Sequence, residues 1–273
     1  MPPQPKSKLT PAKQANRLPK TIILYAESGM GKTTLAGHFP RTGWIIGSQE
    51  QGVRYLSQSR LIPKPIWVDE YGTDSVLSFD QVVKRINKAA LDPSIDTLVC
   101  ETLTDFQAMA FAKCCQEQFK GDMSKDKGFF AYQNGPSTAA QFIWPDLIEA
   151  LNLCAGNGKD VILTAHARVK EHTDADGAKF QKYFPYAHQD IWQRAHKWAS
   201  GVFLITQRTQ VDNDKSTKLK KIAKDENQRI LYVNATPFAA VKNWYGFDKD
   251  TIDLGDTGRE GYENLMKAFE RCQ

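Results

Sequence analysis

The chain has 273 residues, of which 41% are hydrophobic and 25% are charged, and its formal net charge is +5. Such a composition is typical of a globular protein, and the length fits one α/β domain with small additions or two small domains. No apolar run reaches the roughly eighteen residues that a transmembrane helix needs, so we expect no membrane partner.

The cysteines and the N-terminus both favour the cytoplasm. The chain has five cysteines but no C-x-x-C pair, which argues against a disulfide framework and against a structural zinc site. The first residues, MPPQPKSKLTPAKQANRLPK, contain no apolar segment of the kind found in signal peptides. We therefore expect reduced thiols and a cytoplasmic location.

Residues 1–20 form a basic, proline-rich segment that we expect to be a flexible arm. It contains five prolines, four lysines and one arginine, and no acidic residue. A segment with so few apolar residues cannot easily fold alone. It is either a solvated tail or an arm that touches a phosphate backbone or a neighbouring subunit.

From residue 21 onward, short apolar runs alternate with helical patterns. We expect strands at 21–26, 44–48, 65–69, 96–101, 160–165 and 201–207, and helices from about Lys32 and at 77–91, 103–119 and 137–154. This alternation predicts βαβ units and an α/β fold, in which a mostly parallel twisted sheet is flanked by helices.

The C-terminal part of the chain has a different pattern. The stretch KLKKIAKDENQRILYVN predicts an antiparallel hairpin that turns at residues 225–228. We expect a core domain over 21–250, followed by a tail or helix over 251–273. Two stretches without clear periodicity, 120–137 and 167–199, are longer than ordinary loops and are predicted to contact partners.

The stretch TIILYAESGMGKTTLAGHFP, residues 21–40, predicts a phosphate-binding loop between a strand and a helix. The usual pattern begins with glycine, where this chain has Ala26, but a small side chain is tolerated if φ stays negative. Backbone amides of the loop would surround phosphate oxygens, and the helix start adds positive charge. The predicted nucleotide-binding residues are Ser28, Gly29, Met30, Gly31, Lys32, Thr33 and Thr34.

Three further strand ends carry polar residues. Glu101 follows an apolar strand and, with the Thr33 hydroxyl, is the predicted Mg²⁺ site, with Asp105 as an alternative. Glu50 follows the second strand and is predicted to orient the attacking water. His166 follows the fifth strand and is predicted to lie near the γ-phosphate.

These four landmarks, SGMGKTT, SQEQG, LVCETLT and ILTAHAR, occur in the order found in RecA-like P-loop ATPases of bacteriophages. Over residues 20–250 the chain resembles the short, single-domain group thought to act in homologous recombination or single-strand annealing. It departs from the family pattern at Ala26, Ser48, Glu101 and Trp244. Despite these departures we expect the chain to bind nucleotide. The departures concern the rate of ATP hydrolysis, which the resemblance therefore does not predict.

The resemblance implies a RecA-like P-loop NTPase fold with a C-terminal antiparallel hairpin, and an ATPase that uses ATP and Mg²⁺ and is stimulated by DNA. Lys32, Glu50 and His166 would be catalytic. The implied partners are single-stranded DNA, further copies of the chain in a ring or filament, and a single-strand DNA-binding protein. A phage-encoded chain would act in the host cytoplasm.

The resemblance also implies roles for residues after the fifth strand. The DNA-binding candidates are Arg168, Lys170, Lys179, Lys182 and Tyr183, because basic groups track phosphates and aromatic rings stack on bases. Lys242 and Arg168 are the candidates for completing a neighbouring subunit's nucleotide site.

Other functions remain open at this point. An AAA+-type regulator or loader that remodels a protein or nucleoprotein partner is the main alternative, and it would need a separate helical lid. A small-metabolite kinase needs several arginines in a lid, whereas residues 120–137 contain lysines but no arginine. A nucleotide-gated binding module without hydrolysis is the third alternative.

Overall fold

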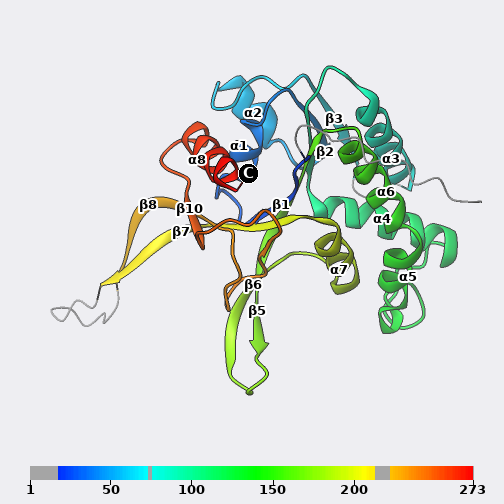
Figure 1. The fold of residues 1–273 in the computed structure, drawn as a ribbon. Helices are drawn as coiled ribbons and strands as arrows, with labels where there is room; N and C mark the ends of the chain where they lie inside the picture. The colour runs from blue at the N-terminus through cyan, green and yellow to red at the C-terminus, as the bar shows by residue number, and fades with distance from the viewer. Residues whose placement is uncertain (1–17, 73–75, 213–221, 273) are drawn as a thin grey trace, which may run out of the picture.

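A computed structural model describes residues 18–72, 76–212 and 222–272 of the protein (Figure 1). Its centre is a sheet with the strand order β10-β8-β7-β1-β5-β4-β2-β3, to which β6 and β9 add at β5 and β7. The strands are β1 (Thr21–Ala26), β2 (Thr42–Gly47), β3 (Trp67–Tyr71), β4 (Thr97–Glu101), β5 (Asp160–Thr173), β6 (Lys179–Pro185), β7 (Gly201–Asp212), β8 (Ile222–Tyr232), β9 (Lys242–Asn243) and β10 (Thr251–Asp253).

The central strands are parallel, which confirms the predicted fold class. β1 pairs in parallel with β5 and β7, β4 with β5 and β2, and β2 with β3. The antiparallel strands are β6 beside β5, β9 beside β7, and the edge pairs β7–β8 and β8–β10. The carboxyl ends of β1, β2 and β4 therefore meet at one edge of the sheet, beside His166, where the parallel pairing of β5 with β1 stops.

Side chains of β1 alternate between two buried layers, as the period of a strand requires. Ile22, Leu24 and Ala26 belong to one cluster, and Ile23 and Tyr25 belong to the other. The first cluster is covered by α1 (Lys32–Gly37), α2 (Gly52–Gln58) and α8 (Gly258–Arg271), and the second by α3 (Val76–Leu91), α4 (Leu103–Gln118), α5 (Asn134–Phe142), α6 (Trp144–Gly156) and α7 (Gln189–Trp198) (Figure 1).

Two sequence expectations about loops and turns are wrong. Residues 225–228 lie inside β8 and not at a turn, because β7 and β8 both extend further than the apolar pattern indicates. Most of residues 167–199 is also regular: β5 continues to Thr173, pairs with β6, and is followed by α7. Backbone pairing maintains the hairpin of β5 and β6, where the side chains are mostly polar and at least partly exposed.

Other element boundaries also differ from those expected. The loop predicted over 120–137 is shorter than expected, because a 3₁₀ turn at Ala131–Gln133 leads directly into α5. Most of the predicted arm lies outside the described residues, but Lys20 is buried and its ammonium lies 3.6 Å from the Asp160 carboxylate. At the other end, α8 contributes Leu265 and Phe269 to the core. Within the described residues, no helix combines the length and apolar character that crossing a bilayer requires.

The close packing of β2 against β3 yields a stability prediction. A Cβ on Gly43 would lie 2.4 Å from the Trp67 ring, which is held by the Arg85 guanidinium on one face and a hydrogen bond from Nε1 to Asp92. We expect Gly43→Ala to lower the free energy of unfolding by about 1–3 kcal/mol in urea denaturation. Gly156→Ala, where a Cβ meets open space at the end of α6, should cost nothing; equal losses would contradict the steric explanation.

Candidate nucleotide site

The site is assembled from the carboxyl ends of β1, β2 and β4 and from the middle of β5. His166 lies inside β5, and not after it as the sequence predicts. In the strand register, Ala26 at the end of β1 lies opposite His166 on β5, and Ile46 on β2 lies opposite Glu101 on β4. Glu50 follows β2 by three residues. The residues that the sequence analysis singled out at separate strand ends are therefore brought to one edge of the sheet.

The loop between β1 and α1 has the backbone that its glycines allow. Gly29 has φ 84° and Gly31 has φ 93°, a left-handed conformation that other residues rarely adopt. Ser28 and Gly29 are exposed, and Met30 and Gly31 are half-buried. Ala26 is the fully buried last residue of β1, so the loop requires no glycine at this position.

The Lys32 ammonium lies across this loop. Lys32 is only 6% exposed, and its Nζ donates hydrogen bonds to the carbonyl oxygens of Ala26 and Glu27, each at 3.1 Å. Burial lowers the pKa of Lys32, while the nearby carboxylates of Glu101 and Glu50 act in the opposite direction. A buried cation beside exposed loop amides is suited to the charge of a polyphosphate.

Thr33 and Glu101 are in direct contact. The Thr33 hydroxyl donates to Glu101 Oε1 at 2.6 Å, whereas Glu101 Oε2 is buried and has no hydrogen-bond partner in the described part of the chain. Burial raises the pKa of Glu101 to about 7. An unpartnered carboxylate oxygen beside a threonine hydroxyl is an oxygen donor set that fits Mg²⁺.

Asp105, the alternative metal residue, lies in the first turn of α4. Its carboxylate accepts a hydrogen bond from the Thr102 hydroxyl at 3.2 Å, and burial raises its pKa. Among the described residues, no group of three or more His, Cys, Asp or Glu side chains could hold an ion. Thr33 and Glu101 would therefore hold Mg²⁺ together with nucleotide phosphates, as is usual for this ion.

Glu50 and His166 form the second polar contact of the site. Glu50 Oε1 lies 3.0 Å from His166 Nε2, and both side chains are partly exposed. The charge of Glu50 also acts on Lys32, Glu101 and Asp105. The three residues predicted to be catalytic, Lys32, Glu50 and His166, thus share one electrostatic environment, and their chemical roles remain predictions.

The two candidates for action on a neighbouring subunit are held by their own chain. Arg168 Nη2 donates to the Ala187 carbonyl at 2.5 Å. Lys242 Nζ donates to the carbonyls of His196 and Lys197, at the end of α7, and lies 3.6 Å from the centre of the Trp244 ring. A role in a neighbouring site would require these contacts to be exchanged.

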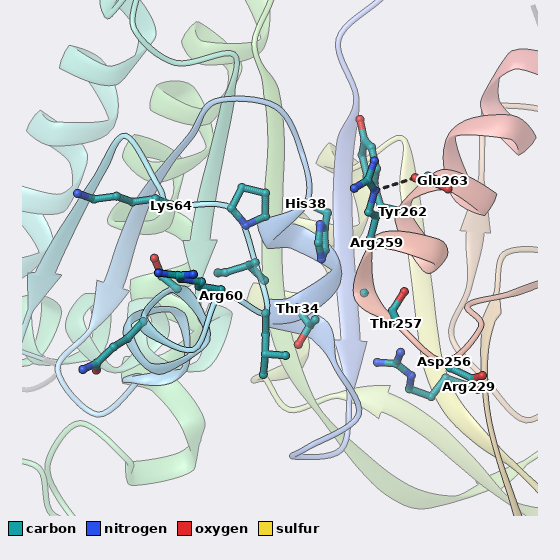
Figure 2. A pocket seen from close by; sticks show the side chains of 16 residues that line it. Thr34, His38, Arg60, Lys64, Arg229, Asp256, Thr257, Arg259, Tyr262 and Glu263 are labelled. Carbon is teal, nitrogen blue, oxygen red and sulfur yellow. Dashed lines mark hydrogen bonds and ion pairs between the residues drawn. The ribbon is translucent and has the colours of Figure 1, made fainter.

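One basic residue near the loop was not singled out from the sequence. Arg229, on β8, lines a cleft of about 1120 Å³ together with Thr34 of the loop and residues of α8 (Figure 2). A Cβ on Gly31 would lie 2.6 Å from Arg229 Nη1. No sequence motif marks this arginine, since its position depends on the pairing of β8 with β7.

The raised pKa of Glu101 predicts a pH-dependent cost of folding. Between its ordinary value of 4.5 and about 7, the folded protein keeps a proton that the unfolded chain has lost, so stability falls as the pH rises through this window and stays lowered above it. We expect Glu101→Gln to gain about 2–3 kcal/mol more in unfolding free energy at pH 8 than at pH 5.

Urea denaturation of the nucleotide-free protein at the two pH values measures this difference. Glu149→Gln, which replaces an exposed glutamate of α6, is the matched control and should have the same effect at both. A pH-independent effect of Glu101→Gln would show that Glu101 titrates as an exposed carboxylate does.

Comparison with known proteins agrees with this geometry. A family model described as an AAA domain matches residues 18–244, a span that contains the loop, Glu50, Glu101 and His166. A search of curated proteins found no match. The matched span covers most of the chain, and the family is of the P-loop ATPase type, which binds nucleotide, typically with Mg²⁺. The chain belongs to the AAA-domain family of P-loop ATPases.

Proposed function

We propose that this ATPase binds single-stranded DNA along one face of the β5–β6 hairpin and acts in phage DNA recombination or annealing. The observation that carries the proposal is that one face of this hairpin gathers basic and aromatic residues and, among its described residues, has no acidic one. The resemblance to short phage RecA-like ATPases supports the same function.

The register of the hairpin determines which side chains share a face. Arg168 lies opposite Phe184, Lys170 opposite Lys182, and His172 opposite Phe180. Directly paired residues, and residues two apart on a strand, project to the same side. One face, which we call the basic face, therefore consists of Arg168, Lys170, His172, Phe180, Lys182 and Phe184.

The basic face has the chemistry that single-stranded DNA requires. The His172 ring contacts the rings of Phe180 and Phe184, and the Lys182 ammonium lies 5.7 Å from the centre of the Phe184 ring. Aromatic faces stack on bases at about 1–3 kcal/mol each, and lysines follow the phosphates. The hairpin projects beyond the body of the protein, where an extended strand has access to it (Figure 1).

The opposite face of the hairpin differs in charge. Two of the five predicted DNA-binding residues, Lys179 and Tyr183, lie on this face, and the other three lie on the basic face. Glu171 projects from this face and forms an ion pair with Lys179 at 3.3 Å, so Lys179 is partly neutralised. Tyr183 packs against the core and exchanges backbone hydrogen bonds with residues 238 and 240. The proposed DNA contacts are therefore Arg168, Lys170 and Lys182.

The hairpin is continuous with the nucleotide site through β5. His166, Arg168, Lys170 and His172 alternate along this one strand, and so they project to the same side. The proposed coupling follows from this continuity: a change in the contact between Glu50 and His166, 3.0 Å apart, displaces the same strand that carries the basic face.

The proposed hydrolysis uses the residues of the site in separate roles. Lys32 neutralises the phosphate chain, and Glu50 accepts a proton from the attacking water while His166 holds its carboxylate in position. Thr33 and Glu101 would hold Mg²⁺ when nucleotide is bound, and the ion would then supply positive charge to the phosphate oxygens.

The alternative, an AAA+-type regulator or loader that remodels a partner, has less support. In the described residues after β7, the only helix is α8, and it packs against α1 and the core. This helix is not a separate lid. A protein-stimulated ATPase that ignores DNA would favour the alternative.

We expect Glu50→Gln to retain nucleotide affinity within about twofold and to lower kcat by roughly 10²–10⁴, because the amide cannot accept the proton. Phosphate release and calorimetric ADP binding measure the two quantities. Glu70→Gln, on β3, is the control with unchanged turnover. Full activity of Glu50→Gln would assign the base to another residue.

The basic face predicts a face-specific loss of DNA binding. Replacing both Lys170 and Lys182 with alanine should weaken binding of fluorescent oligothymidine and reduce the slope of log affinity against log salt by about 1.4, since each lysine neutralises one phosphate and each such phosphate of a single strand contributes about 0.7. Lys179→Ala, on the opposite face, should change neither quantity.

Fluorescence anisotropy between low and moderate salt, without nucleotide and with ADP or an ATP analogue, makes this measurement. Equal effects of Lys179→Ala and the double variant would refute the face assignment. A wild-type protein that binds no single-stranded DNA in any nucleotide state would refute the proposed function, while leaving the ATPase assignment intact.

A further inference from the structure

We infer that Arg229 is a further nucleotide-binding residue, which contacts the inner phosphates of ADP and ATP alike from the cleft beside α8. This inference rests on nucleotide binding by the loop at residues 28–34. It assigns a role to an arginine of the same chain, and it is independent of DNA binding.

The first observation is how closely the guanidinium lies against the loop. Nη1 of Arg229 would be 2.6 Å from a Cβ on Gly31, so it occupies the space that a side chain there would fill. Gly31 precedes Lys32 and caps α1, and the amides at this point are those that surround phosphate oxygens. A phosphate held by them lies within reach of the guanidinium.

The second observation is that most hydrogen-bond donors of the Arg229 guanidinium are not engaged by the described residues. In the described part of the chain, the only hydrogen bond of its guanidinium is a long one, 3.4 Å from Nη2 to the Gly255 carbonyl, and the guanidinium forms no ion pair. The side chain is half-buried. A guanidinium has five donors in a planar arrangement, which matches two oxygens of one phosphate.

The acidic residues of the cleft do not occupy Arg229. The cleft is lined by two acidic residues, Asp256 and Glu263. Glu263 pairs with Arg259 at 3.0 Å, and in the described part of the chain neither carboxylate forms an ion pair with Arg229. Figure 2 shows Arg229 directed toward Thr34 and Thr257, across the opening of the cleft. The cleft is therefore open to a ligand at the position of the guanidinium.

The sheet order identifies which phosphates Arg229 would meet. β8 and β7 lie on one side of β1, whereas β5, β4 and β2, which carry His166, Glu101 and Glu50, lie on the other. The reacting end of the nucleotide belongs with Glu50 and His166. Arg229 approaches from the opposite side, with Thr34, so its contacts would be to the phosphates that ADP and ATP share.

Arg229→Gln and Arg229→Lys test this assignment. We expect Arg229→Gln to weaken ADP and a slow ATP analogue by the same factor, about ten- to hundredfold, as for a lost charge-assisted hydrogen bond. KM for ATP should rise by a similar factor with kcat within about twofold, because the contact is the same before and during reaction. Arg229→Lys should recover part of the affinity.

Arg259→Gln is the matched control, since it removes an arginine that lines the same cleft but is exposed and paired with Glu263. Calorimetry and steady-state kinetics supply the readouts, and urea midpoints show whether each variant is folded. If Arg229→Gln does not fold, Arg229→Lys replaces it as the test. We then expect Arg229→Lys to lose affinity for ADP and for the ATP analogue by the same factor, and unchanged affinity for both would overturn the inference.

Each outcome separates the inference from the ATPase function. Unchanged affinity in Arg229→Gln, with binding lost in Lys32→Ala, would overturn the role of Arg229 alone. A loss confined to the ATP analogue or to kcat would overturn the assignment to inner phosphates. A wild-type protein that binds neither nucleotide would overturn both the inference and the ATPase function.

Discussion

The parallel pairing of β1 with β5, and of β4 with β2 and β5, is the constraint on which the candidate site depends. Glu101 ends β4, Glu50 follows β2, and His166 lies where the parallel pairing of β5 with β1 stops, so this pairing places the three polar groups at one edge of the sheet. The left-handed backbone at Gly29 and Gly31 then turns the chain from β1 into α1. Without this pairing, the same residues would be spread over more than a hundred positions of the chain.

The charges of the site are incompletely balanced in the protein alone. Lys32 and Glu101 are both buried, and one oxygen of Glu101 has no partner among the described residues. Burying such groups costs free energy unless they are paired. A polyphosphate beside Lys32 and a divalent cation beside Glu101 would relieve this imbalance. The buried charges therefore lower the free energy of unfolding of the ligand-free protein at the place where the ligand is expected.

β5 links the two halves of the proposed function. Its first six residues are buried in the centre of the sheet, and its exposed second half pairs with β6. A single strand that is rigid at one end and exposed at the other can carry a displacement from the nucleotide site to the basic face.

The sequence alone was sufficient for the α/β class, the positions of the buried strands and the loop at residues 28–34, because apolar periodicity and glycine spacing are local properties. Tertiary structure decided the rest. It determined how far β5, β7 and β8 extend, that residues 225–228 lie in a strand and not in the expected turn, that Lys170 and Lys182 share a face, and where Arg229 lies. These features depend on pairing between strands distant in the sequence, and on side chains whose polarity does not reveal which partner they meet.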